Sequence, residues 1–344
     1  MTIPVTLITG FLGSGKTTLL NNLLRDPGMA DTAVIINEFG DVAIDHLLVE
    51  SAIENAVVLQ SGCICCTVRG DLVDTLTALT AKAARGELPA FSRIAVETTG
   101  LADPTSIVQI FATEPSLASQ FSLRAVVTTV DAANAPGQLD QFEEARRQVA
   151  LADVLILTKA DLVEPQAVAA LSERLARINP GAEIVPVLHG AISPADLFDL
   201  APEAPSASGE GALRWLKSEA FGARHHDHHH DRHHGSAHSH HDEAINAFAV
   251  TLGEPIDGAA LRQWLNSILS LRGKDLLRMK GIVNVRGAAG PVIVHAVQDI
   301  VHPPVRLEAW PSQDRSTRIV FITRNISQAA LQRSLEFLAS RHRA

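Results

Sequence analysis

Gly10-Phe11-Leu12-Gly13-Ser14-Gly15-Lys16-Thr17 is the stretch that decides the fold of this 344-residue chain. It matches the pattern G-x-x-x-x-G-K-S/T at every fixed position. An apolar run over residues 5–9 predicts a strand before it, and the pattern over 17–24 predicts a helix after it. Glycines let backbone N–H groups close around phosphate oxygens, and the new helix directs its positive end to the same point. The stretch therefore predicts a nucleotide-binding P-loop rather than a chance glycine turn.

The side chains of this loop predict how it holds a nucleotide. Lys16 is expected to reach the β- and γ-phosphates and to act in catalysis, and the hydroxyl of Thr17 is expected to hold Mg²⁺. The residues expected to contact the phosphates are Gly10, Gly13, Ser14, Gly15, Lys16, Thr17 and Thr18.

Around the P-loop, the first 200 residues alternate short apolar runs with helical patterns. This alternation predicts an α/β fold, a P-loop NTPase with a mostly parallel sheet and flanking helices. The expected strands cover residues 5–9, 33–37, 57–59, 94–97, 125–131, 154–158 and 184–187. The expected helices cover residues 17–24, 71–85, 104–111, 140–150 and 165–178.

Changes in composition divide the chain into three parts. Residues 1–200 form the predicted P-loop GTPase domain. Residues 201–243 form a predicted linker that is rich in Pro, Ala, Ser and Gly at its start and then histidine-rich, a composition that cannot bury enough apolar surface to fold alone. Residues 244–344 predict a smaller α+β domain, with a strand, a helix over 258–271, three or four short strands and a last helix over 328–340.

The charge and the N-terminal sequence argue against several classes of partner. A net charge of −9 gives no electrostatic footprint for a nucleic acid. No run approaches the about 18 apolar residues of a membrane span. Residues 1–5 lack the basic region of a signal peptide. We therefore expect a cytoplasmic protein with no nucleic-acid partner and no membrane partner.

A carboxylate at the end of a buried strand should complete the magnesium site. Glu97 ends the predicted strand 94–97 and is the preferred ligand and catalytic residue. Gly100 follows it where its backbone can meet a γ-phosphate. Asp131 ends another predicted strand and is the alternative magnesium ligand, or else it caps the following turn.

Base recognition is predicted at Thr158, Lys159 and Asp161, which follow a predicted strand. A carboxylate such as Asp161 can accept two N–H bonds from a guanine base, which adenine cannot offer, and Lys159 can lie over the base. The usual guanine signature has Asn where this chain has Thr158, which is expected to weaken a hydrogen bond near the loop. The alternative reading makes Asp161 the cap of a turn.

All three cysteines of the chain, Cys63, Cys65 and Cys66, lie within four residues. Thiolates bind soft or borderline ions such as Zn²⁺ and Cu⁺. A closed structural zinc site takes four ligands, so three thiolates leave room for a transferable ion. Small buried side chains and a redox switch are the alternatives. The strand before these cysteines is expected to lie beside the P-loop strand.

Two further features bear on metal binding. Glu38 follows a predicted strand in a segment that resembles a switch, where it can contact Mg²⁺ or a second metal, or be an ordinary surface acid. Neutral imidazoles bind several transition metals, and residues 224–241 hold ten of the chain's fifteen histidines. The metal candidates in this tract are His225, His226, His228, His229, His230, His233 and His234, with a plain solvated linker as the alternative.

Taken together and in order, GFLGSGKTT, NEFG, GCICC, ETTGLADP and TKAD closely resemble the CobW/YjiA group of metal-associated P-loop GTPases. The resemblance covers the whole chain and implies GTP hydrolysis, with GTP and GDP as ligands, coupled to delivery of a transition metal to a client metalloprotein. It also implies that Cys63, Cys65 and Cys66 are the metal site. The metal in this group is usually zinc, and the resemblance does not decide between zinc and cobalt.

Three functions remain open from the sequence. The first is a GTP-hydrolysing metallochaperone. The second is a metal-buffering or storage protein in which the nucleotide is a structural ligand. The third is a small-molecule kinase, which leaves the TKAD and CxCC segments unexplained. The first accounts for the most motifs.

Overall fold

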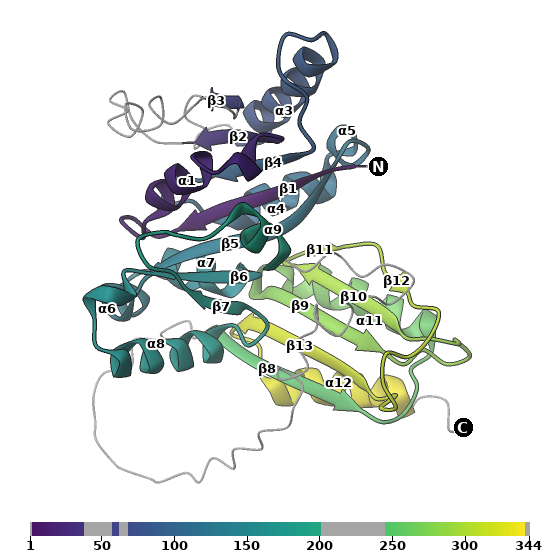
Figure 1. Cartoon of the computed structure of the whole chain (residues 1–344). Helices are drawn as coiled ribbons and strands as arrows, with labels where there is room; N and C mark the ends of the chain where they lie inside the picture. The colour runs from purple at the N-terminus through teal and green to yellow at the C-terminus, as the bar shows by residue number, and fades with distance from the viewer. Residues whose placement is uncertain (1, 38–56, 62–67, 201–244, 341–344) are drawn as a thin grey trace.

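The computed structural model describes residues 2–37, 57–61, 68–200 and 245–340 (Figure 1). Glu38, the three cysteines and the histidine tract lie outside these residues, as do the linker residues 201–243. Within the described part of the chain, no helix is long and apolar enough to cross a bilayer.

The first part of the chain forms a parallel sheet in the order β3-β2-β4-β1-β5-β6-β7. Its strands are β1 (Ile3–Gly10), β2 (Thr32–Asn37), β3 (Val57–Ser61), β4 (Arg93–Glu97), β5 (Phe121–Asp131), β6 (Val154–Thr158) and β7 (Glu183–Pro186). The predicted P-loop NTPase fold and its strands are confirmed. The strand order reverses at β1: β2, β3 and β4 lie on one side of β1, and β5, β6 and β7 lie on the other. Such a reversal is where α/β sheets bind their ligands.

Helices cover both faces of this sheet, as the alternating apolar pattern requires. One core packs the sheet against α3, α4 and α5, another packs it against α1 and α9, and a third packs it against α6, α7 and α8. The helices are α1 (Lys16–Leu24), α3 (Val68–Ala84), α4 (Pro104–Thr113), α5 (Pro115–Ala118), α6 (Ala135–Gln141), α7 (Glu143–Leu151), α8 (Pro165–Ile178) and α9 (Pro194–Leu200). Short 3₁₀ turns cover η1 (Pro27–Met29) and η2 (Ala160–Leu162).

The predicted helix over 140–150 is wrong at its start. Phe142 has an extended backbone, with φ −118° and ψ 123°, and separates α6 from α7. Its ring packs against that of the P-loop residue Phe11, tilted by 34°, with ring centroids 4.8 Å apart. An aromatic contact with a residue far away in sequence therefore overrides local helix propensity.

The second part of the chain forms an antiparallel sheet in the order β11-β10-β9-β13-β8, with β12 paired to β10. Its strands are β8 (Ile245–Leu252), β9 (Leu276–Val283), β10 (Val292–Val297), β11 (Ile300–Val301), β12 (Val305–Arg306) and β13 (Thr317–Arg324). α11 (Gly258–Arg272) and α12 (Gln328–Ser340) pack on one face of this sheet, and the turn η4 (Gly273–Asp275) leads into β9. The expected α+β architecture is confirmed, but β9 and β13 have eight residues each and are longer than expected.

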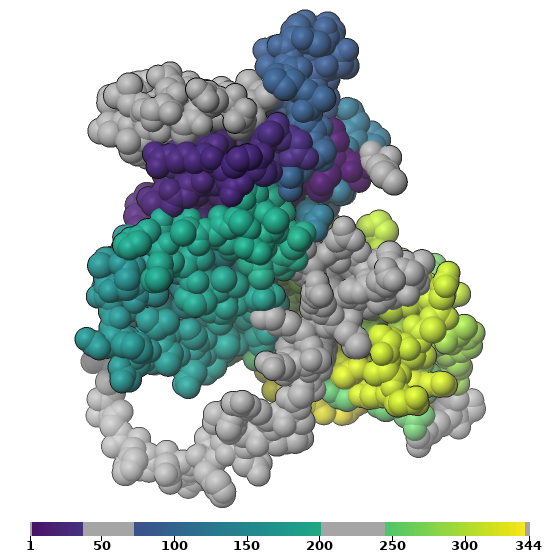
Figure 2. Space-filling view, viewed as in Figure 1, coloured from purple at the N-terminus to yellow at the C-terminus, as the bar shows by residue number. Residues whose placement is uncertain are grey.

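The two parts lie side by side (Figure 2), and a buried ion cluster and a small apolar cluster join them. Asp153, just before β6, accepts a hydrogen bond from the backbone of Val126 at 3.0 Å and one from Lys280 of β9 at 2.8 Å. Arg278 of β9 pairs with the same carboxylate. Burial alone would raise the pKa of Asp153, but Arg278 and Lys280 outweigh it and hold that pKa far below its usual value.

Two stacked histidines lie beside this ion cluster. The rings of His295 and His302 are 4.4 Å apart and nearly parallel, at 6°. They line a cavity of about 110 Å³ with Asp153 and Arg278. Burial lowers the pKa of both histidines, helped for each by Arg278 and Lys280 and opposed by Asp153. His302 itself lowers the pKa of His295 further. The folded protein therefore keeps both rings neutral.

We expect the free energy of unfolding to fall as the pH drops below about 6.5, the usual histidine pKa. Below that pH the two histidines bind protons in the unfolded chain but not in the folded chain. Each histidine therefore lowers the free energy of unfolding by up to about 1.4 kcal/mol per pH unit. Denaturant unfolding at pH 7.5 and 5.5 checks this. Changing His295 and His302 to Gln should flatten the slope, whereas His189→Asn, at an exposed histidine, should leave it as in the parent protein. An unchanged slope in the double variant contradicts the assignment.

Candidate functional site

The P-loop has a backbone that only glycine can follow at its turns. Gly10 ends β1 with φ +144°, and a Cβ there would lie 2.3 Å from the Thr129 hydroxyl oxygen. Gly15 has φ +94° and caps α1. At Gly13, φ is +72° and a Cβ would meet nothing within 4 Å, so the backbone conformation alone favours glycine there. These residues fit the cradle that a phosphate group requires.

Lys16 lies over this loop. Its side chain is buried, and its Nζ donates to the carbonyl oxygens of Gly10 at 3.0 Å and Phe11 at 3.3 Å. Ser14 is also buried, with its hydroxyl 2.6 Å from that of Thr129, whereas Thr18 is exposed on α1. The ammonium group is thus held over the phosphate cradle, beside the backbone that forms it.

Glu97 and Thr17 lie together, as the sequence predicts. The Thr17 hydroxyl donates to the Glu97 carboxylate at 3.2 Å. Glu97 is 4% exposed and ends β4, which lies between β1 and β2 in the sheet. A hydroxyl and a carboxylate beside a phosphate cradle are ligands that suit Mg²⁺.

Asp131, the alternative, is occupied by other partners. Its carboxylate accepts the backbone N–H groups of Ala133 and Asn134 at 2.9 and 3.2 Å, and Lys159 at 2.7 Å. Burial would raise its pKa, but these hydrogen bonds lower it. Asp131 thus caps the turn after β5 and anchors Lys159.

The segment after β6 approaches the P-loop from the other side. The Thr158 hydroxyl donates to the Ser14 carbonyl at 2.7 Å, which joins the end of β6 to the P-loop. Lys159, with φ +56°, donates to the Gly13 carbonyl at 2.9 Å. Asp161 lies exposed in η2. Thr158 and Lys159 therefore tie the end of β6 to the P-loop, and Asp161 stays open to solvent.

Gly100 packs directly against the P-loop. A Cβ at Gly100 would lie 2.8 Å from the backbone nitrogen and Cα of Leu12, so only glycine brings this loop so close. The side chain of Gln148, on α7, donates to the carbonyls of Gly100 and Ala102 at 3.2 and 3.0 Å. The sequence analysis missed Gln148, which lies inside a helix and carries no motif.

The loop after β7 was also missed. Asn22 of α1 donates to the His189 carbonyl at 2.5 Å, and Gly190, with φ +70°, packs on Leu19 of the same helix. Because β7 is the neighbour of β6, this loop lies beside the TKAD segment at the carboxyl edge of the sheet. A glycine after a strand end was the only signal in the sequence.

The metal candidates lie largely outside the described residues, within which no group of three His, Cys, Asp or Glu could hold an ion. One expectation about them is wrong: β3 does not lie beside β1, because β4 and β2 come between them. Instead Asn37 pairs with Ser61 and Ile36 pairs with Glu97. The described chain therefore stops at neighbouring points, just before Glu38 on β2 and just before the cysteine segment on β3.

Comparison with known proteins agrees with this geometry. Residues 4–186 match the family model for the CobW/HypB/UreG nucleotide-binding domain, and residues 245–338 match that for the cobalamin synthesis protein cobW C-terminal domain. The chain is 34% identical over 320 residues to the zinc chaperone YjiA of Escherichia coli, covering 93% of each.

Solved structures extend the likeness over the whole fold. The Zn(II)-bound YjiA GTPase from E. coli has 27% identity and a TM-score of 0.74, covering 98% of this chain and 99% of that one. A Zn(II)-bound YjiA triple mutant, with one glutamate and two cysteines changed to alanine, has 26% identity and a TM-score of 0.76, covering 99% and 100%. This chain therefore belongs to the CobW/HypB/UreG family of nucleotide-binding proteins and carries the CobW C-terminal domain.

Proposed function

We propose that this GTPase binds a transition metal, zinc, at Cys63, Cys65 and Cys66 with Glu38 nearby, and transfers it to a client metalloprotein in a nucleotide-dependent way. The observation that carries the proposal is the pairing of the strands that lead into these residues. Asn37 and Ser61 are partners in the sheet, so Glu38 and the cysteine segment start from adjacent strands. One relative is named a zinc chaperone and one solved relative is a Zn(II)-bound GTPase, which supports zinc rather than cobalt.

The nucleotide half of the proposal assigns a role to each group in the site. Lys16 binds the β- and γ-phosphates, and the Thr17 and Glu97 oxygens hold Mg²⁺, which neutralises phosphate charge. Asp161 accepts the guanine N–H groups, with Lys159 along the base and Thr158 fixing the strand end to the P-loop. Gly100 offers its backbone N–H to the γ-phosphate, which GDP lacks.

Nucleotide and metal can be coupled through β4 and β2. Glu97 is paired with Ile36, two residues before Glu38, and its carboxylate contacts Thr17. Because β2 lies between β4 and β3, a Mg²⁺ ion and γ-phosphate that draw on Glu97 would act two strands from the cysteine segment, and through Glu38 one strand from it. The histidines of residues 224–241 serve as a separate, weak collecting arm in this proposal.

We expect zinc to bind about 5- to 150-fold more tightly or more weakly with a non-hydrolysable GTP analogue than with GDP, the usual range of allosteric coupling. By linkage, zinc must change the affinity for the analogue by the same factor. Competition titration against a zinc chelator, in each nucleotide state, measures this. Equal zinc affinities with the analogue and with GDP would contradict the proposed nucleotide-dependent transfer. They would favour the alternative of a metal-buffering protein.

Two variants separate the kinds of zinc site. Changing Cys65 and Cys66 to Ser should remove the tight, nucleotide-dependent site and leave weak sites. Deleting residues 224–241 should lower the zinc stoichiometry and leave the tight site intact. Because a YjiA triple mutant without two cysteines is still zinc-bound, bound zinc alone does not identify the site, and the nucleotide dependence is the decisive measurement.

A further inference from the structure

We infer that Arg324, in the C-terminal domain, is a positioning residue for GTP hydrolysis, acting through α7 on the loop of residues 100–103. This inference rests on the proposed role of Gly100 at the γ-phosphate, but not on the proposed metal site. Among the residues described, the second domain contributes no group to the P-loop. Through Arg324 it can nevertheless control nucleotide turnover.

The first link is a clamp that α7 places on the loop. Gln148 is 1% exposed and donates to two carbonyls of the loop, those of Gly100 and Ala102. Arg147, the residue before it, forms an ion pair with Asp103 at 3.0 Å. Asp103 also caps α4, accepting the backbone N–H of Thr105 at 2.9 Å. The position of α7 therefore fixes the loop at both of its ends.

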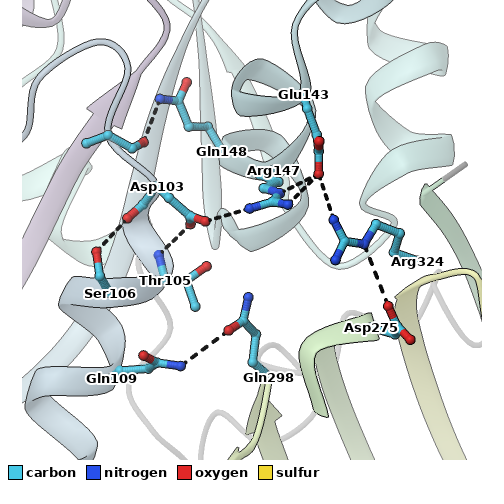
Figure 3. Close-up of polar contacts among 11 residues, drawn as sticks. Asp103, Thr105, Ser106, Gln109, Glu143, Arg147, Gln148, Asp275, Gln298 and Arg324 are labelled. Atoms are coloured by element: carbon cyan, nitrogen blue, oxygen red, sulfur yellow. Dashed lines mark hydrogen bonds and ion pairs between the residues drawn. The ribbon is translucent and has the colours of Figure 1, made fainter. Parts of the chain in front are cut away.

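The second link joins α7 to the C-terminal domain. Glu143, in the first turn of α7, accepts a hydrogen bond from Arg147 at 2.8 Å and one from Arg324 at 2.9 Å, both on the same oxygen (Figure 3). Burial would raise the pKa of Glu143, but the two arginines outweigh it and lower that pKa. Glu143 is therefore an anion shared between two domains.

The third link anchors Arg324 in its own domain. Arg324 ends β13, the strand that lies between β9 and β8, and its Nε is 3.7 Å from Asp275. Asp275 also pairs with Arg272, at the end of α11, at 2.9 Å. A shift of the C-terminal domain must therefore move Arg324 relative to Glu143.

Alternating charge makes this chain of contacts responsive. From Asp103 to Asp275 the signs alternate through Arg147, Glu143 and Arg324, and the three inner side chains are only 18–37% exposed. Partly buried networks are screened less than isolated surface pairs. If Arg324 withdraws, Arg147 becomes the only cation on Glu143 in this chain of contacts and is drawn toward it, which weakens its hold on Asp103. The loop then loses one of its anchors, at Asp103, and keeps those from Gln148 to Gly100 and Ala102.

The test is Arg324→Met in the full-length protein, kept free of zinc. Met has a similar length and no charge. We expect kcat for GTP to fall about fivefold, in the range of known coupling effects, and the affinity for a GTP analogue to fall with it, while the affinity for GDP stays at the parent value. Arg324→Lys should recover part of the loss. Glu143→Gln combined with Arg324→Met should lose no more than the larger single variant.

Lys280→Met is the matched control, because it removes another buried ion pair between the same two domains, and Lys280 pairs with Asp153, two residues beyond the end of α7, rather than with Glu143. It should lower the free energy of unfolding and leave kcat unchanged. If Arg324→Met behaves the same way, with parent kcat and a parent ratio of analogue to GDP affinity, Arg324 only holds the domains together and the inference is overturned. The proposed metal function is tested separately: zinc affinity that ignores the nucleotide sinks it, whatever Arg324→Met does.

Discussion

Lys16→Ala is expected to weaken GTP binding by about 100-fold or more and to abolish detectable hydrolysis. The Lys16 ammonium is buried over the loop, bonded to the carbonyls of Gly10 and Phe11. Charge-assisted hydrogen bonds are each worth about 1.5–3 kcal/mol, and 1.4 kcal/mol is a factor of ten in affinity. Losing the phosphate contacts of one lysine therefore accounts for about two orders of magnitude.

Calorimetric titration with GTP and a phosphate-release assay measure the two effects. Lys82→Ala, at an exposed lysine in the last turn of α3, removes a lysine far from the P-loop and should match the parent protein. Because Lys16 also bonds the loop backbone, circular dichroism should accompany the titration. If a folded Lys16→Ala protein hydrolyses GTP at the parent rate, the P-loop does not hold the nucleotide as proposed.

Asp153→Ala should cost about 3–5 kcal/mol of the free energy of unfolding, as expected for a buried ion pair that loses one partner. The substitution leaves Arg278 and Lys280 buried without their shared carboxylate and takes the acceptor from the Val126 backbone N–H. Denaturant unfolding measures the loss. It should exceed that of any exposed pair, because the penalty comes from stranded buried charge rather than from the lost attraction.

Two further variants test that explanation. Asp314→Ala breaks the 3.4 Å ion pair with Arg318. Because the Asp314 side chain is 53% exposed, the loss in free energy of unfolding should be less than about 1 kcal/mol. Replacing Asp153, Arg278 and Lys280 together by Leu, Met and Met should restore much of the stability, since no charge is then left buried. A single Asp153→Ala protein as stable as the parent would show that the cluster is solvated and carries no such cost.

The nucleotide site is the part that the sequence predicts best, because its requirements are local. Gly10, Gly13 and Gly15 each have the positive φ that the P-loop motif implies, and Glu97 lies against Thr17 at the end of a buried strand. Between two carboxylates, the sequence favours Glu97 but leaves Asp131 as an alternative. Only the fold shows that Asp131 is bonded to Lys159 and to the turn that follows it.

What the sequence could not predict depends on contacts between distant residues. Phe142 breaks a continuous helical pattern because its ring packs against Phe11 of the P-loop. The place of β3 at the edge of the described sheet follows from strand order, which local patterns do not encode. The link from Glu143 to Arg324 spans 181 positions, and neither residue belongs to a motif. The metal site stays a prediction, since Glu38, the cysteines and the histidine tract lie outside the described residues.

Strand β6 connects two features that look separate in the sequence. Asp153, just before its first residue, takes part in the buried ion cluster, and Thr158, its last residue, bonds the P-loop at Ser14. This strand is fully buried and has five residues, at about 3.3 Å per residue, so it forms a short and rigid connection between the ion cluster and the P-loop. A ligand that binds only the native state stabilises everything that unfolds with it. We therefore expect bound GTP to slow proteolysis of the C-terminal domain as well as of the nucleotide domain.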